Sequence, residues 1–162
     1  MSRFSLLAAS LLIAGCAPAA APALSSASDP APPAAGDGAT RILDRAAADR
    51  LLGAKGVTLQ WIGWDQRGPV SVREEGGTIT LSGAQHQPDG PGRLSLSGRV
   101  VEIGADYFTF QGTIRITDTP DPGRMCEGDK QWHFAITQNR PYWRLREFEW
   151  CDGLTDYIDI YF

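Results

Sequence analysis

The sequence predicts a mainly β domain with one short helix at its N-terminal end. We expect a small antiparallel β-barrel, with a β-sandwich as the alternative. Three observations favour this fold class. Apolar and polar residues alternate along most runs beyond Gly56, glycine- and proline-rich turns separate these runs, and every aromatic residue except Phe4 lies beyond residue 40. Residues 41–162 therefore hold enough apolar material for one hydrophobic core.

The helix is expected between Thr40 and Gly53. Thr40 is a candidate N-cap, and Gly53 is a stop signal. Between them Leu43, Ala47 and Leu51 recur at helical spacing. Because the segment is short and amphipathic, we expect it to pack against the strands as a lid or plug.

The clearest strand covers residues 107–116, where Phe108, Phe110, Ile114 and Ile116 share one face. Shorter runs with the same period lie near residues 70–72, 79–81, 94–100, 132–136, 142–150 and 158–162. The alternation shifts near residues 146–147, which predicts a β-bulge that bends this strand. Roughly six to nine short strands with tight turns are typical of a calycin-like barrel.

The composition excludes several classes of protein. The chain has 162 residues, of which 43% are hydrophobic and 21% are charged, and this is the composition of a globular domain. It excludes a disordered chain and a membrane protein with several spans. The net charge is −4 and no run of lysine or arginine is concentrated, so we expect no nucleic-acid partner.

Residues 1–15 have the pattern of a secretory signal peptide: Arg3 is followed by an apolar stretch that is too short to span a bilayer. The run from Leu12 to Cys16, LIAGC, resembles the bacterial lipobox. This resemblance implies cleavage before Cys16, a diacylglycerol on its thiol, and an acyl chain such as palmitate on the new amino terminus. Ala17 in the next position implies sorting to the outer membrane, on its periplasmic or surface face. An ordinary signal peptide is the alternative.

Residues 16–40 continue as a segment rich in alanine and proline, with Leu24 as its only large apolar side chain. Such a segment favours extended polyproline II and cannot form a core. We interpret it as a tether between the lipidated Cys16 and the barrel domain, residues 41–162.

Cys126 and Cys151 remain once Cys16 is lipidated, and in an oxidising envelope we expect them to form a disulfide. A redox or metal pair is the alternative. The acidic loop 118–129 could offer oxygens to calcium, and His86 and His133 could bind zinc, but neither set has the ligand spacing of known sites. We therefore expect no metal or cofactor.

Glu147 and Glu149 are the candidate catalytic carboxylates, since a regular strand would place both on one face. Arg140, Arg144 and Arg146 lie beside them, and alternating arginine and glutamate also decorate solvated sheet faces. Because the motifs of serine hydrolases, zinc proteases and P-loop enzymes are missing from the sequence, an enzyme is the less favoured interpretation.

The segment from Tyr142 to the C-terminus is the densest in aromatic residues, a composition shared by binding hot spots and by barrel cores. Its runs YWRLR, from Tyr142, and DYIDIYF, from Asp156, resemble the ending of a group of uncharacterised bacterial secreted proteins and lipoproteins. The resemblance covers about the last third of the chain. It implies a shared scaffold and no particular activity.

These observations favour a lipid-anchored binding or envelope-maintenance module whose ligand is a protein, a glycan or a small apolar molecule. A hollow barrel would bind the ligand inside, and a packed barrel would bind it on the outer face of Arg144 and Arg146. The residues expected to line a hollow barrel are Trp61, Phe108, Phe110 and Trp132.

Two alternatives remain open. One is an envelope hydrolase that uses Glu147 and Glu149. The other is a barrel that spans the outer membrane, because Ile158, Ile160 and the terminal Phe162 resemble the ending of such proteins.

Overall fold

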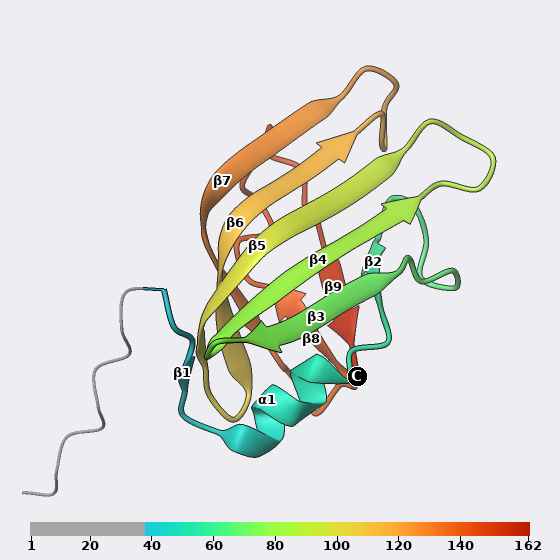
Figure 1. Cartoon of the computed structure of the whole chain (residues 1–162). Helices are drawn as coiled ribbons and strands as arrows, with labels where there is room; N and C mark the ends of the chain where they lie inside the picture. Colours follow the sequence, from blue (N-terminus) through green and yellow to red (C-terminus); the bar gives the residue numbers. More distant parts are fainter. Residues whose placement is uncertain (1–37) are drawn as a thin grey trace, which may run out of the picture. The chain divides into compact units, whose positions relative to one another are not determined.

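Residues 38–162 are described by a computed structural model of the chain, shown in Figure 1. The expected signal peptide, Cys16 and nearly all of the tether lie outside the described residues. The elements in chain order are β1 (Arg41–Ile42), α1 (Arg45–Leu52), β2 (Gly56–Leu59), β3 (Val70–Glu75), β4 (Thr78–His86), β5 (Arg93–Ile103), β6 (Tyr107–Thr117), β7 (Met125–Ala135), β8 (Tyr142–Leu145) and β9 (Ile158–Tyr161). Within this part of the chain, no helix is long and apolar enough to cross a membrane.

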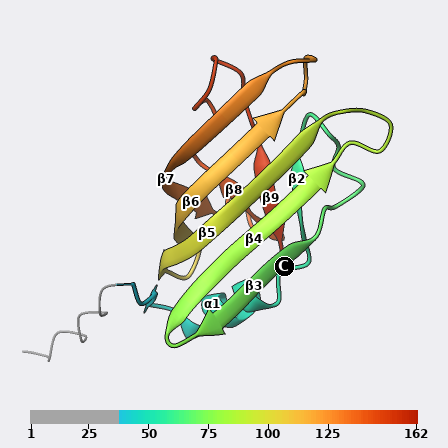
Figure 2. The same cartoon turned by 45° about the horizontal axis from the view of Figure 1, so that its top comes forward.

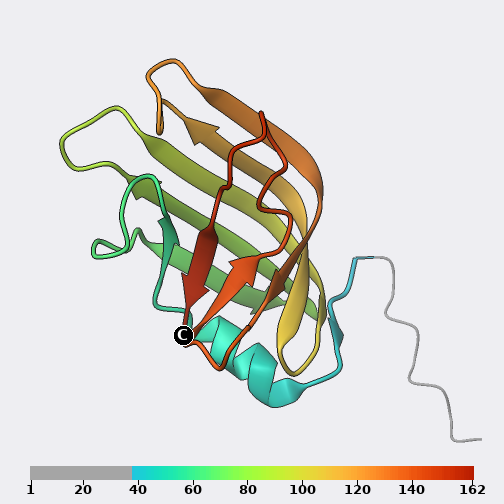
Figure 3. The same ribbon diagram turned by 180° about the vertical axis from the view of Figure 1, so that it is seen from behind.

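The strands form a nearly closed antiparallel barrel, which confirms the predicted fold class. Their order is β2-β9-β8-β7-β6-β5-β4-β3, and β1 adds to β5 in parallel. Strands β3 to β7 lie side by side in Figure 2, and Figure 3 shows the short strands β8, β9 and β2 from behind. The two ends of the order meet where Val57 and Gly68 exchange backbone hydrogen bonds of 3.0 and 2.8 Å. A Cβ at Gly68 would collide with the Ala84 carbonyl oxygen, so this closure depends on glycine.

The long strands bend around a pair of glycines. Gly98 of β5 lies opposite Gly112 of β6, and a Cβ on either would collide with the backbone of the other strand. A register shift between Val100 and Glu102 lies directly beyond this pair. Glycines and bulges are the usual means by which a sheet curves into a barrel.

The predicted bulge near residues 146–147 is wrong. β8 ends at Leu145, and the chain then leaves the sheet. The loop that follows brings Trp150 edge-on against Trp132, with ring centroids 5.1 Å apart, and joins Cys151 to Cys126. Beyond the end of the strand, Trp150 and Cys151 are partly buried and pack against the core.

The helix is real but starts later than predicted. Its N-cap is Asp44, whose side chain accepts a hydrogen bond from the backbone N–H of Ala47. Thr40 instead lies buried among the strands: its hydroxyl donates to the Val100 carbonyl at 2.7 Å and accepts from the Ile79 N–H at 2.8 Å. The α1 helix lies at one end of the barrel (Figures 1 and 3) and buries Ala47 and Leu51, as expected of a plug.

The barrel interior is filled by side chains. The predicted inward face of β6 is confirmed, since Phe108, Phe110, Ile114 and Ile116 are fully buried. Phe108 stacks on Phe134 of β7 with ring centroids 4.9 Å apart. The fully buried side chains from the other strands include Leu59, Ile79, Leu81, Leu94, Trp132, Trp143, Leu145, Ile158 and Ile160.

Candidate functional site

A groove lies on the outer face of the barrel, beside β8. Trp143 and Leu145 of this strand point into the core, so by alternation Tyr142 and Arg144 point outward. The groove has a volume of about 430 Å³ and lies between the turn after β7 and the loop before β9. We call it the arginine groove; it is lined by Thr137, Gln138, Arg140, Arg144, Arg146, Phe148 and Tyr157.

Arg144 is held rigidly in the arginine groove. Its cross-strand partner Asp159 accepts two hydrogen bonds of 2.7 Å from the guanidinium, in the bidentate arrangement that arginine and carboxylate prefer. Its guanidinium carbon lies 4.2 Å from the centroid of the Tyr157 ring, and the rings of Tyr142 and Trp64 lie at 5.2 and 5.5 Å. Arg144 is therefore a fixed part of the groove.

Asp159 is the buried half of this ion pair. Its side chain is 1% exposed, against 13% for that of Arg144. Burial raises the pKa of Asp159, whereas the hydrogen bonds and the charge of Arg144 oppose that rise. The hydrogen bond to Asp159 raises the pKa of Arg144, so the guanidinium stays protonated.

Arg140 and Arg146 are the other two cations of the arginine groove. Within residues 38–162 neither takes part in any of the ion pairs, which use Arg41, Arg45, Arg115, Arg124 and Arg144. Arg140 is half-buried, 5.9 Å from the ring of Tyr142, and Arg146 is exposed, 5.8 Å from the ring of Phe148. The residues that line the groove include three arginines and no carboxylate; Asp159 neutralises Arg144, and the charge of Arg140 also acts on Asp159.

The four residues expected to line a hollow barrel do not form a binding cavity. Phe108, Phe110 and Trp132 are fully buried in the packed core, where the Trp132 indole N–H donates to the Gly112 carbonyl at 2.8 Å. Trp61 lies at the barrel end, and its indole N–H donates to Asp156 at 2.9 Å. The packed interior leaves the outer face, which carries Arg144 and Arg146, as the candidate site.

The two candidate catalytic carboxylates lie in the loop after β8 and not on a strand. Glu147 accepts a hydrogen bond of 3.0 Å from the backbone N–H of His133, so it tethers the loop to β7. Glu149 is exposed to solvent. The shared strand face that suggested a catalytic pair is therefore not present.

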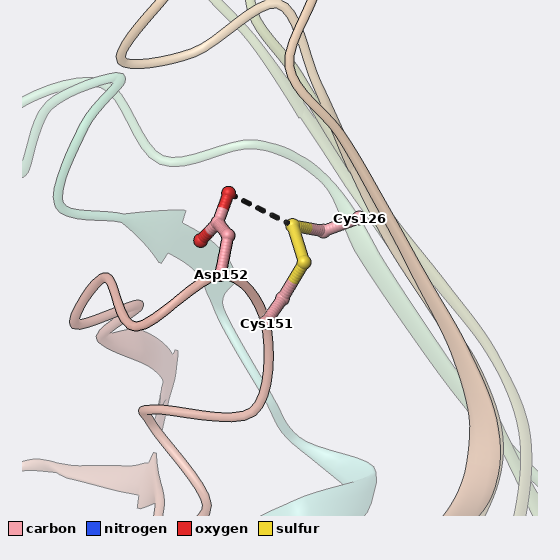
Figure 4. A group of neighbouring side chains, drawn as sticks. All are labelled: Cys126, Cys151 and Asp152. Atoms are coloured by element: carbon pink, nitrogen blue, oxygen red, sulfur yellow. Dashed lines mark hydrogen bonds between the residues drawn. A yellow bond between two sulfur atoms is a disulfide. The ribbon is translucent and has the colours of Figure 1, made fainter.

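The predicted disulfide is present between Cys126 and Cys151, whose Cα atoms lie 6.0 Å apart. Figure 4 shows the Asp152 carboxylate beside it, 3.7 Å from the Cys126 sulfur. These three residues are grouped closely enough to suggest a metal site, but the two sulfurs are bonded to each other and offer no thiolate. His86 of β4 and His133 of β7 are separated by two intervening strands and do not share a site.

A buried ionic cluster that the sequence did not suggest ties three loops together at the end of the barrel near the disulfide. Arg124 donates hydrogen bonds of 2.9 to 3.0 Å to Asp152, to Asp156 and to the Thr119 carbonyl. The Asp156 side chain is 0% exposed and also accepts from Trp61. This cluster holds the loop before β9 in place, and with it Tyr157.

The fold and the groove define the chain as a small antiparallel barrel domain with an arginine-lined outer face. Residues 39–162 match the model of the PM1083 family, and the chain belongs to this family. A relative is the uncharacterized protein PM1083 of Pasteurella multocida (strain Pm70), which is 34% identical over 116 residues, or 70% of this chain and 74% of that protein. No solved structure matches the chain. The predicted resemblance to an uncharacterised bacterial family is thereby confirmed.

Proposed function

We propose that this protein is an envelope lipoprotein, attached to the membrane through acyl chains on Cys16, whose barrel domain binds an anionic ligand at the arginine groove. The observation that carries the proposal is the pair of arginines, Arg140 and Arg146, that have no ion-pair partner in the described chain and flank half-exposed aromatic rings. Arginine and aromatic side chains are the groups most often found at binding hot spots. The fixed Arg144 between them preorganises the site.

The outer surface of the long strands is polar, as expected for a domain that is attached to the membrane by a lipid anchor. Outward-facing Thr80 and Ser82 of β4 and Ser95 and Ser97 of β5 are exposed and polar. A barrel that crosses a membrane presents an apolar band at these positions. This polarity favours a domain that is tethered beside the membrane over one that spans it.

The anchor is tested by fractionating cells that produce the wild type or Cys16→Ser. We expect the wild type in the outer-membrane fraction with a triacylated N-terminal peptide in mass spectra, and the variant among the water-soluble proteins. The same membrane distribution for both would contradict lipid attachment. Ala17→Asp supplies a matched control for sorting, because it keeps the acylated cysteine.

The arginine groove is tested by placing a photo-crosslinking residue at Thr137, which lines it, or at Ser95 on a distant outer face. We expect a discrete crosslinked product in intact cells from position 137 only. Arg140→Ala with Arg146→Ala should abolish it. The same product from both positions, or a product that survives the double substitution, would argue against this site.

A further inference from the structure

We infer that the ligand of the arginine groove is an acidic saccharide, whose carboxylate or phosphate is held by Arg140 and Arg146 and whose ring lies against Phe148 and Tyr157. This inference rests on the proposed function and adds the chemical class of the ligand. It follows from the charge, the aromatic surface and the accessible shape of the groove.

The two arginines without an ion-pair partner favour an oxyanion as the charged part of the ligand. Arg144 is neutralised by Asp159, so two positive charges remain among the groups that line the groove. The planar guanidinium of arginine matches the two oxygens of a carboxylate or a phosphate, and it binds either of them better than an ammonium would.

The aromatic residues favour a ring or another apolar surface next to the anion. Phe148 and Tyr157 lie with ring centroids 5.3 Å apart and planes at 64°, so they form a corner, and both are half-exposed. The C–H groups on the face of a sugar pack well into such a corner. Thr137 and Gln138 line the same groove with hydrogen-bonding groups that suit sugar hydroxyls.

The shape of the groove favours a saccharide over an acidic peptide. β8 pairs with β7 at Arg144 and Leu145 and with β9 from Tyr142 to Arg144, so both edges of the strand are already occupied at Arg144, in the middle of the groove. The volume of about 430 Å³ falls in the range of small-molecule sites. Trp64 is 41% exposed, and the Arg144 guanidinium carbon lies 5.5 Å from the centroid of its ring.

The test is calorimetric titration of the mature lipoprotein in detergent micelles with four probes: glucuronate, glucose 6-phosphate, glucose and inorganic phosphate. We expect glucuronate or glucose 6-phosphate to bind at least tenfold more tightly than both glucose and inorganic phosphate. Tighter binding of glucuronate would indicate a carboxylate as the oxyanion, and tighter binding of glucose 6-phosphate would indicate a phosphate. Arg140→Ala with Arg146→Ala should weaken this binding by about 10- to 100-fold. Phe148→Ala should also weaken it.

Arg73→Ala with Arg99→Ala is the matched control, because it removes two arginines from β3 and β5 on another part of the barrel. This control should leave binding unchanged, and equal melting temperatures of all variants would show that folding is intact. The inference of an acidic saccharide would be overturned if glucose bound as tightly as glucuronate, if phosphate bound as tightly as glucose 6-phosphate, or if no probe bound. If the crosslink from position 137 still depends on the two arginines in that case, the proposed site stands and only the ligand class fails.

Discussion

Replacing Arg124 with leucine tests whether the buried ionic cluster holds the barrel end together. The guanidinium donates five hydrogen bonds, of which two reach Asp156, whose side chain is fully buried. Arg124→Leu leaves this carboxylate with Trp61 as its remaining side-chain partner. Stranding one half of a buried ion pair typically costs about 3–5 kcal/mol, and we expect a loss of this size in the free energy of unfolding at pH 7.

The double variant Arg124→Leu with Asp156→Asn separates the stranded charge from lost packing. The asparagine side chain would keep a carbonyl oxygen for the Trp61 indole and carries no charge, so the double variant should recover about half or more of the loss. Urea unfolding followed by fluorescence of the buried Trp132 and Trp143 measures each free energy. A loss below about 1 kcal/mol for Arg124→Leu, or a double variant no more stable than the single one, would refute this reasoning.

Three further predictions concern stability. Cys126→Ala with Cys151→Ala opens a crosslink between residues 25 apart and should lower the free energy of unfolding by about 3.5 kcal/mol in the chain-entropy model; an unchanged urea midpoint would contradict this. The hydrogen bond from Arg124 holds the pKa of Asp152 below its ordinary value, so the unfolded chain binds this proton more readily than the folded protein. The carboxylate therefore contributes its full stabilisation above the ordinary aspartate pKa range. This contribution is lost as the pH falls through the pKa of Asp152 in the folded protein. Asp152→Asn should therefore flatten the stability curve below about pH 4, and parallel curves for the two proteins would exclude the effect. Gly112→Ala places a Cβ against the Ser97 carbonyl oxygen and should lower the free energy of unfolding by about 2 kcal/mol or more. Ser95→Ala on the outer face should change it little, and thermal melts of the two variants measure the difference.

The barrel was predictable because its central strands β4, β5 and β6 are long and alternate between buried and exposed residues over most of their length. In β6 the faces read from the sequence are the faces observed, since Phe108 and Phe110 are buried and Arg115 is exposed. Thr40 shows where such reading fails. A threonine before a helical pattern resembles an N-cap, but its hydroxyl is used 60 residues away at Val100, and no local signal reports this partner.

The candidate site was predictable only in part. Arg144 and Arg146 were expected on an outer face because they alternate with apolar residues. The roles of Phe148 and Tyr157 depend on a loop that leaves the sheet, and alternation carries no information there. Arg124 and Asp156 are separated by 32 residues and come together only through the closure of the barrel.

The most direct test of the central claim is an NMR titration that maps which side chains respond when the protein binds glucuronate or glucose 6-phosphate. We expect shifts confined to the guanidinium signals of Arg140 and Arg146 and to the rings of Phe148 and Tyr157. Shifts centred on the rings of Phe108, Phe110 and Trp132 would instead place the ligand inside the barrel and would contradict binding on its outer face.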